Sequence, residues 1–149
     1  MAEYTIKLNK NDVYEEVAKT TSYTGHKKQD DEKAYDRIFT TDEDFNMLER
    51  FWNESKNTVC NGLKKFLVNE EDTKDEYSIT LNMSSSFDEI LFESMKRSMY
   101  SYFVMNIIAK WFSISNKPET EEYITYASAN FDDVMRKAFY KKKPQRPTY

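Results

Sequence analysis

The chain has 149 residues, of which 39% are hydrophobic and 15% aromatic, enough to build one folded domain. Only 2 Gly and 3 Pro leave few positions for tight turns, so the composition argues against an all-β fold and favours long helices. A single Cys excludes an internal disulfide, and a single His nearly excludes the common zinc sites. We therefore expect no enzyme activity, no metal and no cofactor.

The formal net charge is −4, but the charge is unevenly distributed. Six cations and no acid lie in residues 136–149, so the remainder of the chain is strongly acidic. An acidic body does not attract nucleic acid, and the basic C-terminal segment is a separate feature. The N-terminus lacks the apolar core of a signal peptide, and no apolar run reaches the length of a membrane span. We expect a soluble cytoplasmic protein without membrane contact.

The N-terminal residues predict a strand followed by a short helix. Apolar side chains alternate with polar ones at about 4–8, which is typical of a half-buried strand. Asn9 or Asn11 is placed to cap a helix, which we expect to end near Tyr23 because Gly25 is a natural stop.

A long helix is predicted next. Thr41 and Asp44 have the arrangement of a helix N-terminus, with acids where the helix dipole favours them. Apolar residues then recur at helical spacing over roughly 26 residues, and the acidic run 69–76 predicts a solvated loop. The apolar stripe consists of Phe45, Leu48, Trp52, Val59, Leu63 and Phe66.

A second strand and a third helix follow. The alternation over 77–83 is the clearest strand pattern in the chain. Ser86 and Glu89 have the spacing of a capping box for the next helix. Between Met99 and Phe112 this helix is apolar on nearly every side, so the core or other subunits must cover it all round.

Pro118 fits the first turn of a last helix, which should end near residue 140. The predicted fold is mainly α: a bundle of three long helices plus a short N-terminal helix, with two short strands, in one domain over 1–140. In the predicted core, the stripe on the long helix packs against Phe87, Ile90, Leu91, Phe103 and Ile107, with Ile124, Phe131 and Val134 closing it.

The two strand segments have similar sequences, EYTIKLN at 3–9 and EYSITLN at 76–82. Either two short strands have similar compositions, or the two strands pair with each other. Each strand needs a partner for its backbone groups, in its own chain or on a neighbouring subunit. The strand residues that we expect at a subunit contact are Tyr4, Ile6, Leu8, Tyr77, Ile79 and Leu81.

No group of residues predicts a catalytic site. His26 lies in a polar segment without a second imidazole anywhere in the chain. Adjacent acids such as Glu15 and Glu16 diverge by about 100° on a helix, so they do not converge on one substrate atom. The 11 tyrosines suit a core or a protein interface.

Residues 141–149 predict an extended basic tail, because Pro144 and Pro147 prevent a helix. Such a tail either keeps the protein soluble or docks on an acidic partner, with its aromatic end as an anchor. The candidate docking residues are Tyr140, Lys141, Lys142, Lys143, Arg146 and Tyr149.

The order of the elements resembles the head–tail connector (adaptor) proteins of tailed bacteriophages. The shared layout is a short helix, a long capped helix, a strand, a long apolar helix, a last helix and a basic tail broken by prolines. The stretches 39–44, 51–54 and 132–137 also resemble structural proteins of phages of gut Bacteroides, including the crAss-like group. The resemblance covers most of the chain and rests on layout and short stretches.

The resemblance implies a structural virion protein without catalytic residues. It implies a ring, commonly a dodecamer, at the head–tail junction, assembled in the cytoplasm of the bacterial host. The neighbours would be other copies of the chain, the portal protein toward which the tail reaches, and other tail or connector proteins, with passing contact to DNA in the channel.

Two other classes of protein fit the same sequence. One is a small cytoplasmic regulatory protein, helical and acidic, that works as a monomer or dimer. The other is a nucleic-acid accessory protein that uses the basic tail. Its DNA binding would depend strongly on salt and would be lost without 141–149.

Overall fold

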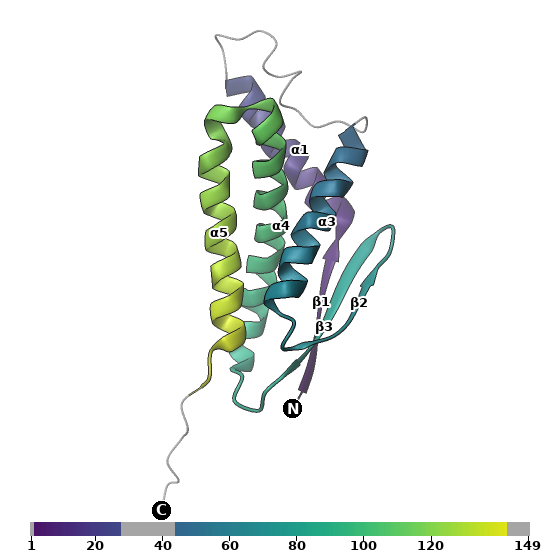
Figure 1. The fold of residues 1–149 in the computed structure, drawn as a ribbon, viewed down its shortest axis with the longest axis vertical. Helices are drawn as coiled ribbons and strands as arrows, with labels where there is room; N and C mark the ends of the chain where they lie inside the picture. Colours follow the sequence, from purple (N-terminus) through teal and green to yellow (C-terminus); the bar gives the residue numbers. More distant parts are fainter. Residues whose placement is uncertain (1, 28–43, 143–149) are drawn as a thin grey trace, which may run out of the picture.

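The computed structural model describes residues 2–27 and 44–142. In this part of the chain, four helices pack with a three-stranded antiparallel sheet (Figure 1). The prediction of a mainly α fold is therefore confirmed. The elements are β1 (Ala2–Asn9), α1 (Lys10–Lys27), α3 (Phe45–Gly62), β2 (Leu67–Asp72), β3 (Glu76–Met83), the 3-10 turn η2 (Glu89–Leu91), α4 (Phe92–Ser115) and α5 (Lys117–Phe139).

The N-terminal helix α1 is long, with 18 residues, and the prediction of a short helix is wrong. It begins as expected, because the Asn9 side chain accepts a hydrogen bond from the Asp12 amide at 3.2 Å. It does not end at Gly25, which is buried and helical. A glycine ends a helix when it takes a positive φ, and no described residue of this chain does so.

β3 is the central strand of the sheet, and both β1 and β2 run antiparallel to it. Tyr4 pairs with Leu81, and Leu8 pairs with Tyr77. The two strands of similar sequence therefore pair with each other within the chain, as one of the two sequence hypotheses predicted. Their alternating apolar residues share one face of the sheet. A shift of the pairing by one residue would turn all of these side chains to the solvent, so their burial fixes the register.

β2 corrects the prediction of a solvated loop over 69–76. The acidic segment forms a strand and a tight connection to β3, in which the Thr73 amide donates to the Glu76 carbonyl at 2.9 Å. A register shift between Leu67 and Asn69 places a bulge in this strand. The sequence analysis did not predict this strand, because residues 68–72 are all exposed and show no apolar alternation.

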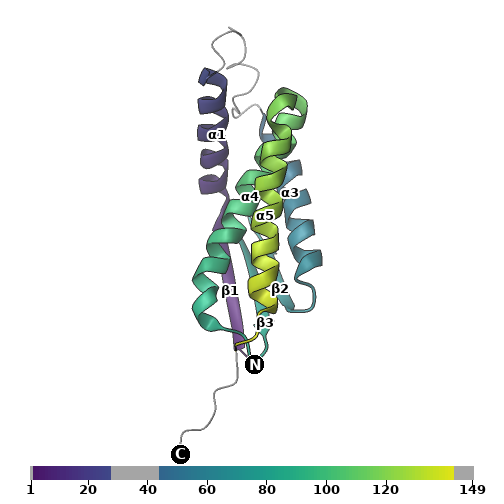
Figure 2. The ribbon, with the colours of Figure 1, turned by 90° about the vertical axis from the view of Figure 1, so that its left-hand side faces the viewer.

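α4 forms the centre of the molecule and packs against α1, α3 and α5. Figure 2 shows α4 and α5 in front of the sheet. Because other elements cover α4 on several sides, nearly all of its faces are apolar. Trp52 of α3 is fully buried at the junction of these layers. Its ring contacts Phe103 of α4 and Tyr77 of β3, at centroid distances of 4.7 and 5.9 Å.

Three residues of the predicted core are exposed instead: Phe45 at 49%, Ile90 at 82% and Ile124 at 51%. Ile90 is exposed because the chain forms the turn η2 there and the helix starts only at Phe92. Leu91 and Phe131 are half-buried. The other predicted core residues are buried: Leu48, Trp52, Val59, Leu63, Phe66, Phe87, Phe103, Ile107 and Val134.

Two predicted helix boundaries also change. Asp88, rather than Ser86, caps the turn before α4, and its Oδ1 accepts from the Ile90 amide at 3.2 Å. α3 ends at Gly62, earlier than the apolar stripe suggests, because the chain turns there to enter β2. The predicted start of that helix at Thr41 lies outside the described residues. Pro118 occupies the first turn of α5, as predicted.

Candidate functional site

The side chains of the predicted subunit-contact residues face the chain's own core. Tyr4 is half-buried, and the other five are at most 4% exposed. These side chains are therefore committed to the fold, and only the edges and the outer face of the sheet are open to a neighbouring molecule. The five buried residues are Ile6, Leu8, Tyr77, Ile79 and Leu81.

The start of the predicted tail is extended and lies against the body. α5 ends at Phe139, and Tyr140 takes an extended backbone conformation. Lys141 forms an isolated antiparallel bridge with Phe87, and the Lys142 amide donates to the Ser86 carbonyl at 2.9 Å. Tyr140, Lys141 and Lys142 are exposed. The other candidate docking residues, Lys143, Arg146 and Tyr149, lie outside the described residues.

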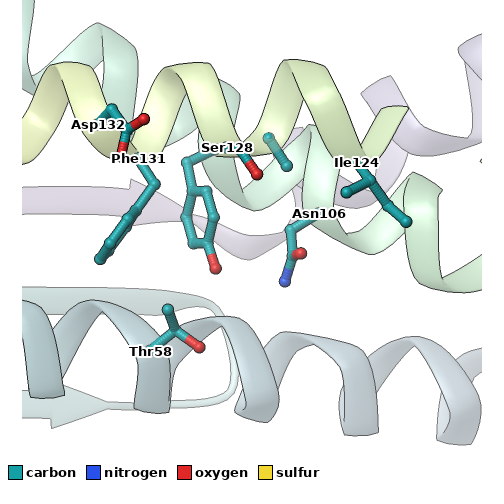
Figure 3. A pocket seen from close by; sticks show the side chains of 8 residues that line it. Thr58, Asn106, Ile124, Ser128, Phe131 and Asp132 are labelled. Carbon is teal, nitrogen blue, oxygen red and sulfur yellow. The ribbon is translucent and has the colours of Figure 1, made fainter. Parts of the chain in front are cut away.

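A groove of about 200 Å³ separates α3 from α5, and α4 forms its floor (Figure 3). Asn106 on the floor donates a hydrogen bond to the Ser55 hydroxyl at 2.7 Å. The half-exposed Ile124 lies at one end of the groove, on α5. The lining is mixed in polarity: Thr58, Tyr102, Asn106, Ile124, Ala127, Ser128, Phe131 and Asp132.

Gly62 allows α3 and α5 to approach each other beyond the groove. A Cβ at this position would lie 2.8 Å from the Phe131 ring and about 3 Å from the Met135 side chain. The absence of a side chain at Gly62 therefore permits the close approach of α3 to α5, which bounds the groove. Sequence analysis missed this groove because its lining residues come from three helices and form no motif.

A larger cleft of about 470 Å³ lies beside β1, between the end of this strand and the first turns of α4. The Tyr100 hydroxyl crosses it to donate to the Asp12 carbonyl at 3.3 Å. The cleft has a mixed, slightly cationic charge, with three cations and two acids. The charged side chains are Lys7, Lys96, Arg97, Asp12 and Glu93.

The one cysteine forms a polar cluster between α3 and the sheet. The Cys60 thiol and the Tyr77 hydroxyl both donate to Glu70 Oε2, at 2.9 and 2.8 Å. Burial, aided by the hydrogen bond to the Glu70 carboxylate, raises the pKa of the Cys60 thiol to about 11. The hydrogen bonds from Cys60 and Tyr77 lower the pKa of Glu70. The thiol therefore stays protonated and is unsuited to nucleophilic chemistry.

Asp72 at the end of β2 forms the second polar attachment of this strand. Its carboxylate pairs with Lys10 of α1 and, at 3.1 Å, with Lys56 of α3. Burial opposes ionisation, but the hydrogen bonds from the two lysines outweigh it and lower the pKa of Asp72. Lys10 also lies 5.4 Å from the centre of the Trp52 ring. This network holds the acidic end of β2 against the helices, whereas Leu67 at the start of the strand packs against the core.

Within residues 2–27 and 44–142, no group of three or more His, Cys, Asp or Glu side chains is arranged to hold a metal ion. In the same residues, no helix combines the length and apolar character needed to cross a membrane. The side chain of His26 lies outside the described part of the structure. The described surfaces of interest are therefore two grooves, the sheet edges and the start of the tail.

No protein-family model, curated protein or solved structure matches this chain.

Proposed function

We propose that this chain is a non-enzymatic structural protein of a bacteriophage virion, which forms a ring that joins the portal to the tail. The observation that carries the proposal is that exposed apolar side chains occur at both ends of the molecule. A protein held between two different partners needs contacts at two ends, whereas apolar side chains gain nothing by facing water.

One end of the molecule is formed by the last turns of α1 and α4 (Figure 1). Tyr23 near the end of α1 is 66% exposed, and Ile114 near the end of α4 is 58% exposed. The opposite end carries the start of α4 and the end of α5. There Ile90 is 82% exposed, and Phe139 and Tyr140 are 48% and 46% exposed. Each end thus offers apolar anchors of the kind that protein interfaces bury.

The described start of the tail lies at the second of these ends. There Lys141 forms a bridge with Phe87, and the Lys142 amide donates to the Ser86 carbonyl, directly after the end of α5 at Phe139. Positive charge and exposed apolar side chains therefore occur together at this end. This combination supports docking on an acidic protein surface, for which the portal is the partner that the connector resemblance implies.

The experiment is electron microscopy of the purified protein, alone and mixed with the portal protein of the same phage. We expect ring-shaped density on one face of the portal. Two variants test the tail: deletion of residues 141–149, and a scrambled tail that keeps its composition. Both should lose portal binding, because a protein groove recognises the order of side chains as well as the charge.

A matched control replaces the exposed Lys64 and Lys74 by Glu, which changes the charge elsewhere on the body. This variant should bind the portal as the natural chain does. If the scrambled tail supports assembly equally well, specific docking of the tail is wrong. If the protein does not bind the portal, but binds DNA in a salt-dependent manner that requires 141–149, it is instead a nucleic-acid accessory protein.

A further inference from the structure

We infer that copies of this chain join edge to edge, with β2 of one copy added to β1 of the next as a parallel strand. The interface makes a continuous sheet from the three-stranded sheets of successive copies. The inference extends the proposed function. It rests on that function for one point, the closure of successive copies into a ring.

The two outer strands of the sheet have backbone groups without partners within the described residues. β3 pairs with one edge of β1 and one edge of β2. Within residues 2–27 and 44–142, no backbone–backbone hydrogen bond joins residues 2–8 or 68–72 to anything other than β3. Such edges are the structural element to which an additional strand binds.

The direction of the strands permits a head-to-tail arrangement. β1 and β2 are both antiparallel to β3, so they run parallel to each other on opposite edges of the sheet. When β2 of one copy adds in parallel to β1 of the next, all copies keep the same orientation. The contact uses two different surfaces and leaves a free edge at each end of the pair. Repetition of such a contact generates a ring or a filament.

The register of the sheet brings opposite charges together at this junction. Lys7 of β1 and Glu71 of β2 both pair with Ser78, from opposite sides of β3. They lie on one rung across the sheet, on its outer face and exposed. If the next copy continues the sheet at the same level, its Lys7 lies beside Glu71. The next rung on the same face is uncharged, with Thr5 and Asn69 both paired to Thr80.

The surroundings of the two edges have matching charges. The cleft beside β1 adds Lys96 and Arg97 to Lys7 and also holds the acids Asp12 and Glu93, so this edge has a small cationic excess. β2 carries three acids in its last three residues, 70–72. The cleft also leaves space along the last residues of β1, where the acidic end of β2 would lie in a parallel junction. Charge complementarity therefore selects β2 as the partner of β1.

The charges also oppose pairing of identical edges at β2. Two β2 strands side by side would bring two outward-facing Glu71 side chains together, and like charges on adjacent strands are destabilising. Two β1 strands could pair antiparallel, with Glu3 opposite Lys7 and Thr5 opposite its copy. That arrangement yields a closed dimer and leaves β2 unused, so it predicts that changes at Glu71 have no effect.

Oxidative crosslinking distinguishes the two arrangements. In a Cys60→Ser background, Lys7→Cys and Glu71→Cys are introduced in separate full-length chains carrying tags of different mass. Within one chain, the Cα atoms of positions 7 and 71 are about 9–10 Å apart across β3, which is too far for a disulfide. We expect the mixture to form mainly the 7–71 heterodimer, and the chain with both cysteines to form a ladder of multimers.

A charge exchange tests the same contact without cysteines. Lys7→Glu and Glu71→Lys should each weaken self-association, measured by sedimentation velocity, by about tenfold. The double exchange should restore it to within about threefold of the natural chain. The control is Glu76→Lys, an exposed charge change on the central strand, which should change association much less.

Predominant crosslinking of two Lys7→Cys chains would overturn the inference in favour of the β1 dimer. Only monomers in every oxidised sample, including samples assembled on the portal, would overturn edge pairing altogether. Other outcomes distinguish a failure of the proposed function from a failure of the edge contact. A crosslinked ladder without portal binding supports the edge contact and contradicts the connector role. Rings on the portal without the 7–71 crosslink support the connector role and contradict the edge contact.

Discussion

β1 and β2 flank the same strand, β3, but different forces hold them against the helices. β1 presents Ile6 and Leu8 to the core, and both are buried. β2 has no buried residue: Leu67 is half-buried against the core, and the exposed remainder is attached through Glu70 and Asp72. A strand can therefore be fixed in a sheet by apolar burial or by hydrogen bonds and ion pairs. The first mechanism contributes more stability, because exposed ion pairs gain little in water.

The largest effect should come from Trp52, which packs against β3, the strand that β1 and β2 flank. Trp52 contacts Tyr77 of the central strand and is fully buried. Trp52→Ala should lower the free energy of unfolding by about 3–5 kcal/mol, because a large cavity opens in the core. Urea denaturation followed by circular dichroism measures it. The control is Ile124→Ala, at a half-exposed position, which should lower the free energy of unfolding by less than about 1 kcal/mol. An equally small loss for Trp52→Ala would contradict the burial of Trp52 in the core.

The next effect compares the two outer strands directly. Ile6→Ala in β1 removes a fully buried side chain and should cost about 2–4 kcal/mol. Val68→Ala in β2 removes a side chain that is 52% exposed, and should cost less than about 0.5 kcal/mol. Both are measured by denaturation at low protein concentration, where copies do not associate. Equal losses would show that β2 is buried in solution.

The smallest effect concerns the polar attachment of β2 and depends on pH. Asp72→Asn should cost about 0.5–1 kcal/mol at pH 7, because the carboxylate loses its attraction to Lys10 and Lys56. The folded protein lowers the pKa of Asp72, so its charge stabilises the fold above the unfolded pKa, near 4. This contribution should disappear as the pH falls below about 4.

The control for this prediction is Glu71→Gln, which changes the neighbouring acid on the outer face of the same strand. Its free energy of unfolding should stay within about 0.5 kcal/mol of the natural chain at every pH. If the two variants show the same pH dependence, the effect reflects the net charge of β2 rather than the contacts of Asp72.

The difference between the strands also explains what could be predicted. β1 and β3 were recognisable because the alternation of Tyr4, Ile6 and Leu8 reflects burial of one face. The same logic missed β2, because hydrogen bonds to Cys60, Tyr77 and two lysines leave no periodic trace in a sequence. The exposure of Ile90 was missed because apolar spacing places a residue on a helix face but does not say where the helix begins.

The candidate surfaces divide in the same way. The end of α5 near residue 140 could be predicted from the sequence, because local backbone constraints act without distant contacts. The groove over Asn106 and the cleft beside Lys7 required the packing of α3, α4, α5 and β1. Such surfaces exist only where residues distant in sequence meet.

The sequence by itself determined the helical class, the pairing-competent strands and most of the buried residues, because composition and periodicity act through local geometry and hydrophobic burial. Only the tertiary structure decided that β3 lies between β1 and β2, and that Lys7 and Glu71 share one rung. Strand order and register depend on which surfaces meet after the helices have packed, and no single segment carries that information.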